Sequence, residues 1–452
     1  MSSRRTMDML NGPIWGKMIL FALPLALTGV LQQLYNAADV AVLGRYVSSE
    51  AMAAVGNNVP VIGLVVSLFM GLALGANVIV ARFIGMKDEE QANVAVHTSV
   101  SLAIVFGVGI AILGELFAGV ITDMLGVPEA VADYSETYLR VYIAGMPFMA
   151  IYNFLAAIFR SKGDTQTPLF ALAVASVFNI VGNLFLVLVC GMGAGGVALA
   201  TVLANLLSAA ILFRKQMTLE GALKLDPRKL FRFDGRSGRA VIRVGMPAAI
   251  QGMVFSLSNL IIQSAINSLG PDAMAGSVAA FTIEINVYCF INAFGLAATT
   301  FVSQNYGAGN LARCRRATWV SMGLNFAATF VLLALVYTFA EDLLGFFSDN
   351  PGVIALGVTR ILYVVLPEPV NVIMETVSDA MRGYGYSMPP AMVTLFCICT
   401  IRVIWVWTVF SASPDYATLM QVYPISWVIT TVALCWLYWH HQKKVLPMKH
   451  GL

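Results

Sequence analysis

Long apolar stretches follow one another from end to end of the chain, separated by short segments rich in charged residues, Gly and Pro. A helix needs about 20 apolar residues to cross a bilayer core, and these stretches reach that length. They lack the weak alternation of membrane β-strands. The pattern therefore predicts an all-α integral membrane protein with twelve spans, at approximately 14–43, 51–82, 92–119, 131–161, 168–191, 194–215, 240–268, 275–306, 316–340, 355–382, 388–411 and 417–441.

Composition agrees with this pattern. Of 452 residues, 59% are hydrophobic and 11% are charged, against about 45–50% and about 25% in soluble proteins. A net charge of +3 is too small and too dispersed for nucleic-acid binding. The apolar stretch from Ile14 is too long for a signal-peptide core, so we expect it to be the first span. Since no nucleophile–base pair, metal cluster or phosphate loop stands out, we expect neither an enzyme nor a cofactor.

Basic and acidic residues fall on opposite sides of the predicted spans. The termini and the loops that follow even-numbered spans are basic, with Arg4, Arg5, Lys87, Lys162, Lys224, Arg228, Arg313 and Lys443. The opposite side keeps only Arg45, Arg140 and Arg360, and it carries acids instead, among them Glu50, Asp123, Glu129, Asp272, Asp342 and Asp415. The positive-inside rule therefore places both termini in the cytoplasm of a multi-pass protein of the plasma (inner) membrane.

The second half of the chain repeats the first. At one fixed offset Ala51 falls on Ala273, Leu74 on Leu296, Pro147 on Pro369, Arg160 on Arg382 and Pro168 on Pro390. Each half then holds six spans in the same orientation, which predicts two six-helix bundles related by a pseudo-two-fold axis along the membrane normal. Parallel repeats of this kind are a secondary-transporter architecture.

The repeat predicts the organisation of the chain. We expect an N-terminal lobe at 1–215, a cytoplasmic connector at 216–239 and a C-terminal lobe at 240–452. Apolar residues of the connector, such as Leu223 and Leu225, favour a place on the cytoplasmic surface, and a solvated linker fits equally well.

Ionisable residues inside a membrane are expensive and are therefore candidate functional groups. In span one, Gln32, Asn36 and Asp39 recur at helical spacing, and Tyr35 is an aromatic candidate beside them. Asn179 and Asn183 are four apart in span five and share a helix face. Asp39 is therefore a candidate for a functional site, and the alternative is that its side chain simply reaches water at the membrane interface.

The second half carries acids of its own, Glu284 in span eight and Glu368, Glu375 and Asp379 in span ten. We expect Gln32, Tyr35, Asn36, Glu284, Tyr288, Glu368 and Glu375 to line a substrate cavity, with helix packing as the alternative for Glu284. The pair of prolines around Glu368 predicts a broken helix. Asp379 is expected to pair with Arg382, and Arg402 to neutralise one of the acids. Arg160 and Arg382 are expected to anchor their spans at the cytoplasmic interface.

Several short motifs, in this order, resemble a known family. Leu23-Pro24 lies early in span one, and Asp39 is followed by Gly44 near its end. Arg-x-x-Gly-Asp-Thr-x-x-Pro closes span four at 160–168, and a degenerate copy lies at 382–390. Over essentially the whole chain these features resemble the bacterial branch of the multidrug and toxic-compound extrusion (MATE) family. The resemblance implies an antiporter that exports organic cations and drugs in exchange for Na⁺ or H⁺.

The resemblance also implies a coupling site. In the family an Asp of span one, an Asn and an Asp of span five and a Thr of span six surround a cation. Asp39, Asn179 and Thr201 match this pattern, whereas Asn183 stands at the position of the second acid. Carboxamide oxygens still suit a hard cation, so Asp39, Asn179 and Asn183 are possible Na⁺ ligands. A lone carboxylate can carry a proton instead.

We therefore expect a transporter of small organic cations, acting by alternating access, as a monomer in the lipid bilayer. The alternative is a flippase for lipid-linked oligosaccharides, which shares this superfamily architecture. Flippases of anionic pyrophosphate lipids need central basic residues. Only Arg402 lies well inside the predicted spans, against five acids, so the charge pattern favours the cation transporter.

Overall fold

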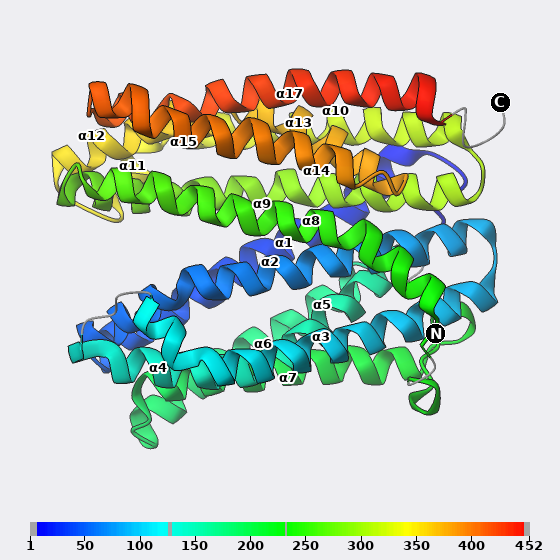
Figure 1. The fold of residues 1–452 in the computed structure, drawn as a ribbon, viewed down its shortest axis with the longest axis horizontal. Coiled ribbons are helices and arrows are strands. Elements are labelled where there is room, and N and C mark those ends of the chain that lie inside the picture. Colours follow the sequence, from blue (N-terminus) through cyan, green and yellow to red (C-terminus); the bar gives the residue numbers. More distant parts are fainter. Residues whose placement is uncertain (1–6, 125–128, 231–232, 447–452) are drawn as a thin grey trace. The chain divides into compact units, whose positions relative to one another are not determined.

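The chain folds into helices and short connections. The computed structural model describes residues 7–124, 129–230 and 233–446, and within them it holds no β-strand (Figure 1). Contacts divide the chain into unit 1, Met1–Asp8 with Leu27–Ala249, and unit 2, Met9–Ala26 with Ile250–Leu452. The all-helical prediction is confirmed.

The helices of the first half begin and end close to the predicted spans. They are α1 (Ile14–Tyr46), α2 (Ser49–Met86), α3 (Glu89–Met124), α4 (Glu129–Ala144), α5 (Met146–Ser161), α6 (Gln166–Leu184) and α7 (Gly193–Met217). A π-helical segment, η1 (Phe185–Val189), extends α6.

The second half repeats this order with more interruptions. Its elements are α8 (Gly235–Asn267), α9 (Pro271–Gly307), α10 (Leu311–Thr338), α11 (Ala340–Gly345), α12 (Pro351–Arg360), η4 (Ile361–Val365), α13 (Glu368–Gly383), α14 (Met388–Thr394), η5 (Leu395–Thr400), α15 (Ile401–Trp405), η6 (Val406–Phe410), α16 (Tyr416–Met420), α17 (Val422–His440) and η7 (His441–Val445). Here η4, η5, η6 and η7 are π-helical.

Two spans are bent at equivalent places in the repeat. Among the described residues ten helices are long and apolar enough to cross a membrane, and up to twelve if each bent pair is one span. The axis turns by 46° between α4 and α5, and by 40° between η4 and α13. Each second helix starts with a proline in its first turn, where the ring suits a helix start and lacks a donor to continue the preceding one. The break predicted at Glu368 is thus confirmed.

Helices α1 and α8 are each divided between the two units. The division falls after Ala26 in α1 and after Ala249 in α8. A proline lies two residues before each division, Pro24 in α1 and Pro247 in α8, and a proline inside a helix removes one backbone hydrogen bond. The first part of α8 therefore packs within unit 1, and the first part of α1 within unit 2.

The first part of α8 meets α2 at close range inside unit 1. A Cβ atom on Gly245 would lie 2.8 Å from the backbone oxygen of Gly71, and one on Gly75 would collide with the backbone oxygen of Val241. Only glycine allows such an approach, so these residues fix where the two helices cross.

The connector is packed against unit 1. Two short 3₁₀ helices, η2 (Gly221–Leu223) and η3 (Pro227–Lys229), form part of it. Leu223 and Leu225 are buried in the core of this unit. The side chain of Asn93 donates to the backbone oxygen of Lys224 (2.8 Å), and His97 Nε2 accepts from the backbone N–H of Asp226 (3.0 Å). The structure therefore favours a docked surface segment over a solvated linker.

Candidate functional site

Four polar side chains from three helices meet inside unit 1. Asp39 on α1 is 6% exposed. Its Oδ1 accepts from Asn183 Nδ2 on α6 (2.6 Å), and its Oδ2 accepts from the Thr201 hydroxyl on α7 (3.0 Å). Asn183 Nδ2 also donates to Asn179 Oδ1 (3.1 Å), and Asn179 Nδ2 donates to Thr201 Oγ1 (3.3 Å). We call these four residues the Asp39 cluster.

The local sequence explains why the Asp39 cluster forms. Asn179 and Asn183 are one helical turn apart, so both point from one face of α6. The cluster is adjoined by an apolar core of the same unit, formed by Val42, Leu43, Val55, Tyr138, Val187, Ala194, Val197 and Ala198. A carboxylate beside such a core must be hydrogen-bonded to be tolerated. The members predicted from the sequence all come together, and Asp39 is buried within the structure.

The donor set of the Asp39 cluster fits a small hard cation or a proton. Oxygen atoms suit Na⁺, and the cluster offers a carboxylate, two carboxamide oxygens and a hydroxyl. Asn183 Oδ1 is buried and has no hydrogen-bond partner among the described residues. Because amide nitrogen and oxygen can exchange places by rotation, this oxygen could turn toward a cation beside Asp39.

The other span-one candidates lie around the cluster. The Tyr35 hydroxyl donates to the backbone oxygen of Thr201 at 3.4 Å. Gln32 is half-buried, and Asn36 is exposed. Within the described part of the chain, the hydrogen bonds of Asp39 go to Asn183 and Thr201 rather than to Asn36. Their helical spacing therefore does not bring Asn36 and Asp39 into one bonded group.

Glu284 has an ion-pair partner that the sequence analysis missed. Its Oε2 lies 2.9 Å from Nη2 of Arg360, and the two side chains are 13% and 5% exposed. Arg360 also donates to Ser277 (2.7 Å) and lies over the rings of Phe281 and Tyr423. The charge pattern counted Arg360 among the few basic residues of the outer side, whereas this residue ends α12 and is buried inside unit 2. Its position in the predicted 355–382 span was the available signal.

Within the described residues Arg402 forms no ion pair with an acid, which corrects the expectation of a paired charge. It lies on α15, and its Nη1 donates to the side-chain oxygen of Asn259 at 2.7 Å. Its guanidinium lies over the rings of Tyr423 (4.5 Å) and Phe255 (5.1 Å). With Arg360 and Arg382 also buried, the count of a single interior basic residue was wrong, and it no longer separates the two candidate functions.

The remaining acids of unit 2 are on α13. Asp379 pairs with Arg382 at 2.5 Å as predicted, and Arg382 also donates to Gln251 (2.8 Å). Arg382 is thus buried and held by two side chains, and its role as an anchor at the cytoplasmic interface stays a prediction. Arg160, the equivalent residue of unit 1, is half-buried at the end of α5.

Tyr288, Glu375 and Glu368 are within unit 2. Tyr288 and Glu375 lie close enough to each other to interact electrostatically. Glu368 is buried in the first turn of α13 and accepts from Asn371 at 2.8 Å. An acid in a first turn is favoured by the helix dipole, which is a structural reason for Glu368 to stand there.

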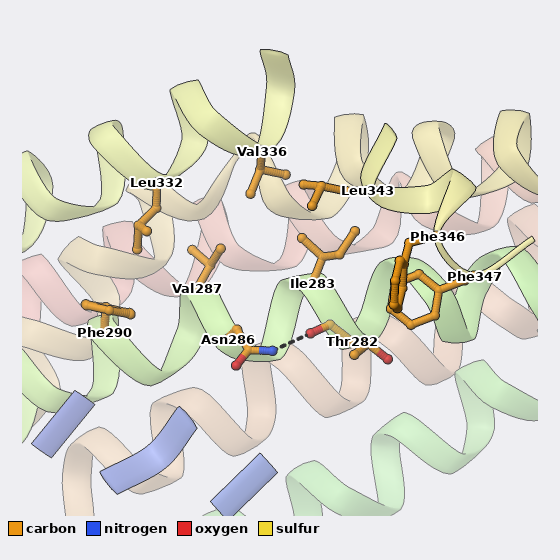
Figure 2. Close-up of a pocket in the computed structure, with 10 residues that line it drawn as sticks. All are labelled: Thr282, Ile283, Asn286, Val287, Phe290, Leu332, Val336, Leu343, Phe346 and Phe347. Carbon is orange, nitrogen blue, oxygen red and sulfur yellow. Dashed lines mark hydrogen bonds between the residues drawn. The ribbon is translucent and has the colours of Figure 1, made fainter. Parts of the chain in front are cut away.

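An apolar pocket of about 390 Å³ opens on α9, α10 and α11 (Figure 2). Its lining consists of Thr282, Ile283, Asn286, Val287, Phe290, Leu332, Val336, Leu343, Phe346 and Phe347. Figure 2 shows Asn286 beside Thr282, whose backbone oxygen accepts from its amide at 2.7 Å. None of the acids proposed as cavity residues lines this pocket, so it does not bring them together.

Comparisons of the sequence and of the fold with known proteins point to the same family. A model of the MatE family matches residues 24–185 and 247–408, which are the two repeats. The probable multidrug resistance protein YoeA of Bacillus subtilis is 28% identical over 398 residues, which are 86% of each chain. The probable multidrug resistance protein NorM of Thermotoga maritima is 29% identical, over 85% of this chain and 83% of the relative. A solved outward-facing MATE transporter superposes with a TM-score of 0.89 at 20% identity, over 98% of both chains.

Proposed function

The chain belongs to the MATE family of multi-pass membrane proteins, and from this premise we propose that it exports amphiphilic organic compounds, organic cations and drugs among them, in exchange for H⁺ or Na⁺. Export proceeds by alternating access in the plasma membrane. The relatives named as multidrug resistance proteins support the substrate class. The observation that carries the coupling is the Asp39 cluster, a buried carboxylate whose hydrogen-bond partners among the described residues are neutral side chains.

The Asp39 cluster can link an ion to a conformational change. A negative charge is costly to seal away from water, so the cluster closes readily only after a cation or a proton has neutralised it. An ion shifts a conformational equilibrium only if it binds one state more tightly than the other. Asp39 on α1 meets residues of α6 and α7 here, so movement among these helices changes the number of oxygens around the ion.

Transport in inside-out membrane vesicles tests this proposal. A fluorescent organic cation should accumulate in the lumen when H⁺ or Na⁺ is held at higher concentration there, with the membrane potential clamped. Imposing the two gradients separately identifies the coupling ion. Vesicles lacking the protein are the control, and uptake that ignores both gradients would contradict the antiport.

The orientation of the chain is a second testable prediction. A cysteine placed at Arg228 on η3 should react with a membrane-impermeant maleimide only from the cytoplasmic side, and one at Asp342 on α11 only from outside. Both positions are exposed. The background should lack the native cysteines, because Cys190 and Cys435 are exposed too. Labelling of either site from the opposite side would contradict the predicted orientation. Arg4 and Arg5, which contributed to this prediction, lie outside the described residues.

A further inference from the structure

Arg402 is the largest side chain that is fully buried in the described structure. Its partners are a neutral carboxamide, Asn259, and the faces of two aromatic rings, Phe255 and Tyr423. Its Nε–H is buried and has no hydrogen-bond partner among the described residues. A guanidinium cannot lose its charge at physiological pH, so a positive charge is held here without an ion-pair partner.

Among the described residues no carboxylate forms an ion pair with Arg402. Glu284 interacts with it electrostatically, but that carboxylate is ion-paired with Arg360. Arg360 lies over the same Tyr423 ring, 5.6 Å from its centroid. Arg360 and Arg402 therefore lie over the same aromatic ring, and within the described part of the chain only Arg360 of the two is ion-paired. A buried charge is tolerated when it is paired, and an unpaired one inside a membrane protein marks a functional group.

A ligand would reach Arg402 by displacing the side chain of Asn259. Asn259 lies on α8 and is exposed, although its side-chain oxygen accepts from Arg402. Exposed apolar residues flank it on the same helix, Leu257 and Leu260. A ligand on this part of α8 would meet apolar surface and, on displacing one neutral amide, a guanidinium with an unused donor.

We propose that Arg402, covered by Asn259, forms a subsite that accepts the carboxylate of an amphiphilic substrate. This inference rests on the proposed function and specifies that its substrates include zwitterionic and anionic amphiphiles. The Nε–H and a neighbouring Nη–H of a guanidinium match the two oxygens of a carboxylate in a planar fork. The bound carboxylate supplies the counter-charge that Glu284 cannot provide to both arginines.

Two dyes that differ in one group provide the test. Tetramethylrhodamine carries a free carboxylate, and its methyl ester keeps the same cationic ring system without it. Binding to the full-length protein in lipid nanodiscs is measured by fluorescence polarisation. Arg402→Gln should weaken binding of the carboxylate dye by about tenfold to a hundredfold, the range for a lost charge-assisted hydrogen-bonded pair, and should leave binding of the ester little changed.

A second variant keeps the test decisive if Arg402→Gln does not fold. Asn259→Asp places a carboxylate of the protein itself beside Arg402. It should raise the thermal unfolding midpoint and weaken binding of the carboxylate dye, with the ester unaffected. Asn267→Asp, at another exposed asparagine of α8, is the matched control and should do neither.

The outcomes separate the subsite from the function on which it rests. If wild type binds both dyes but the Arg402 and Asn259 variants alter both affinities alike, or neither, the carboxylate subsite is wrong and the transporter proposal stands. If wild type binds and transports neither dye, the amphiphile transporter itself is contradicted, and the subsite with it.

Discussion

Replacing Asp39 with asparagine is expected to abolish ion-driven efflux while the protein remains folded in the membrane. Asparagine keeps the size of the side chain and one oxygen for Thr201 or Asn183, but it can neither carry a proton nor attract a cation. Coupling between two sites is typically worth about 1–3 kcal/mol, or about 5–150-fold in affinity. Without a bound ion this coupling is lost and the gradient cannot drive export, so vesicle uptake should fall to the level of passive leak.

The matched control is Asp342→Asn, which removes an exposed acid on α11 that is remote in sequence from the Asp39 cluster. It should transport like wild type. Both proteins must be present in the membrane at equal amounts, as judged by gel-filtration of the solubilised protein. Full ion-driven uptake by Asp39→Asn would place the coupling site elsewhere, with Glu284 as the next candidate.

Asn183→Asp should act in the opposite direction on the same cluster. The amide that donates to Asp39 at 2.6 Å would become a second carboxylate, so two negative charges would repel one another unless a cation lies between them. We expect tighter Na⁺ binding and an unfolding midpoint that rises with NaCl more than with choline chloride. An equal response to the two salts would count against cation ligation here.

Replacing Arg360 with methionine is expected to destabilise the protein strongly. Its partner Glu284 would lose its ion-pair partner while remaining half-buried, and breaking a buried ion pair from one side typically costs about 3–5 kcal/mol. The ring contacts with Tyr423 and Phe281 would be lost as well. The effect should appear as a lower thermal midpoint of the detergent-solubilised protein.

Two further variants show whether a loss of stability in Arg360→Met comes from the broken ion pair. Arg360→Met combined with Glu284→Gln should recover much of the loss, because neither member of the broken pair is then left charged. Arg140→Met is the control for an exposed pair, since Arg140 and its partners Glu115 and Glu136 are each more than a third exposed. Its shift should be small. A shift for Arg360→Met no larger than that of Arg140→Met would show that the buried pair adds little.

Much of the fold could be predicted because bilayer crossing imposes length and apolarity on each span. The paired prolines around Glu368 predicted a break because a proline cannot continue the hydrogen bonding of a helix. The Asp39 cluster could be anticipated only in part. The spacing of Asn179 and Asn183 gives a shared face, but their approach to Asp39 and Thr201 came from the family resemblance.

The partners of the buried arginines could not be predicted from the same signals. Hydropathy reports how deep a residue lies and gives no information on which helix it faces. Arg360 and Glu284 are 76 residues apart, and Arg402 reaches Asn259 over 143 residues. Each pairing depends on how helices rotate against one another within unit 2. A local charge pattern therefore suggested Arg402 as a counter-ion, whereas Arg360 takes that role.

The divided first helix has a consequence for the order in which the protein is made. Met18 and Phe21 of α1 are fully buried, and Phe21 packs edge-to-face on Phe301. Asn305 and Arg313 both donate to the backbone oxygen of Met9. These partners leave the ribosome only after most of the chain has been synthesised. The first apolar segment is therefore in the bilayer before its packing partners have been synthesised. In a chain that stops at the connector, this packing surface would have no partner.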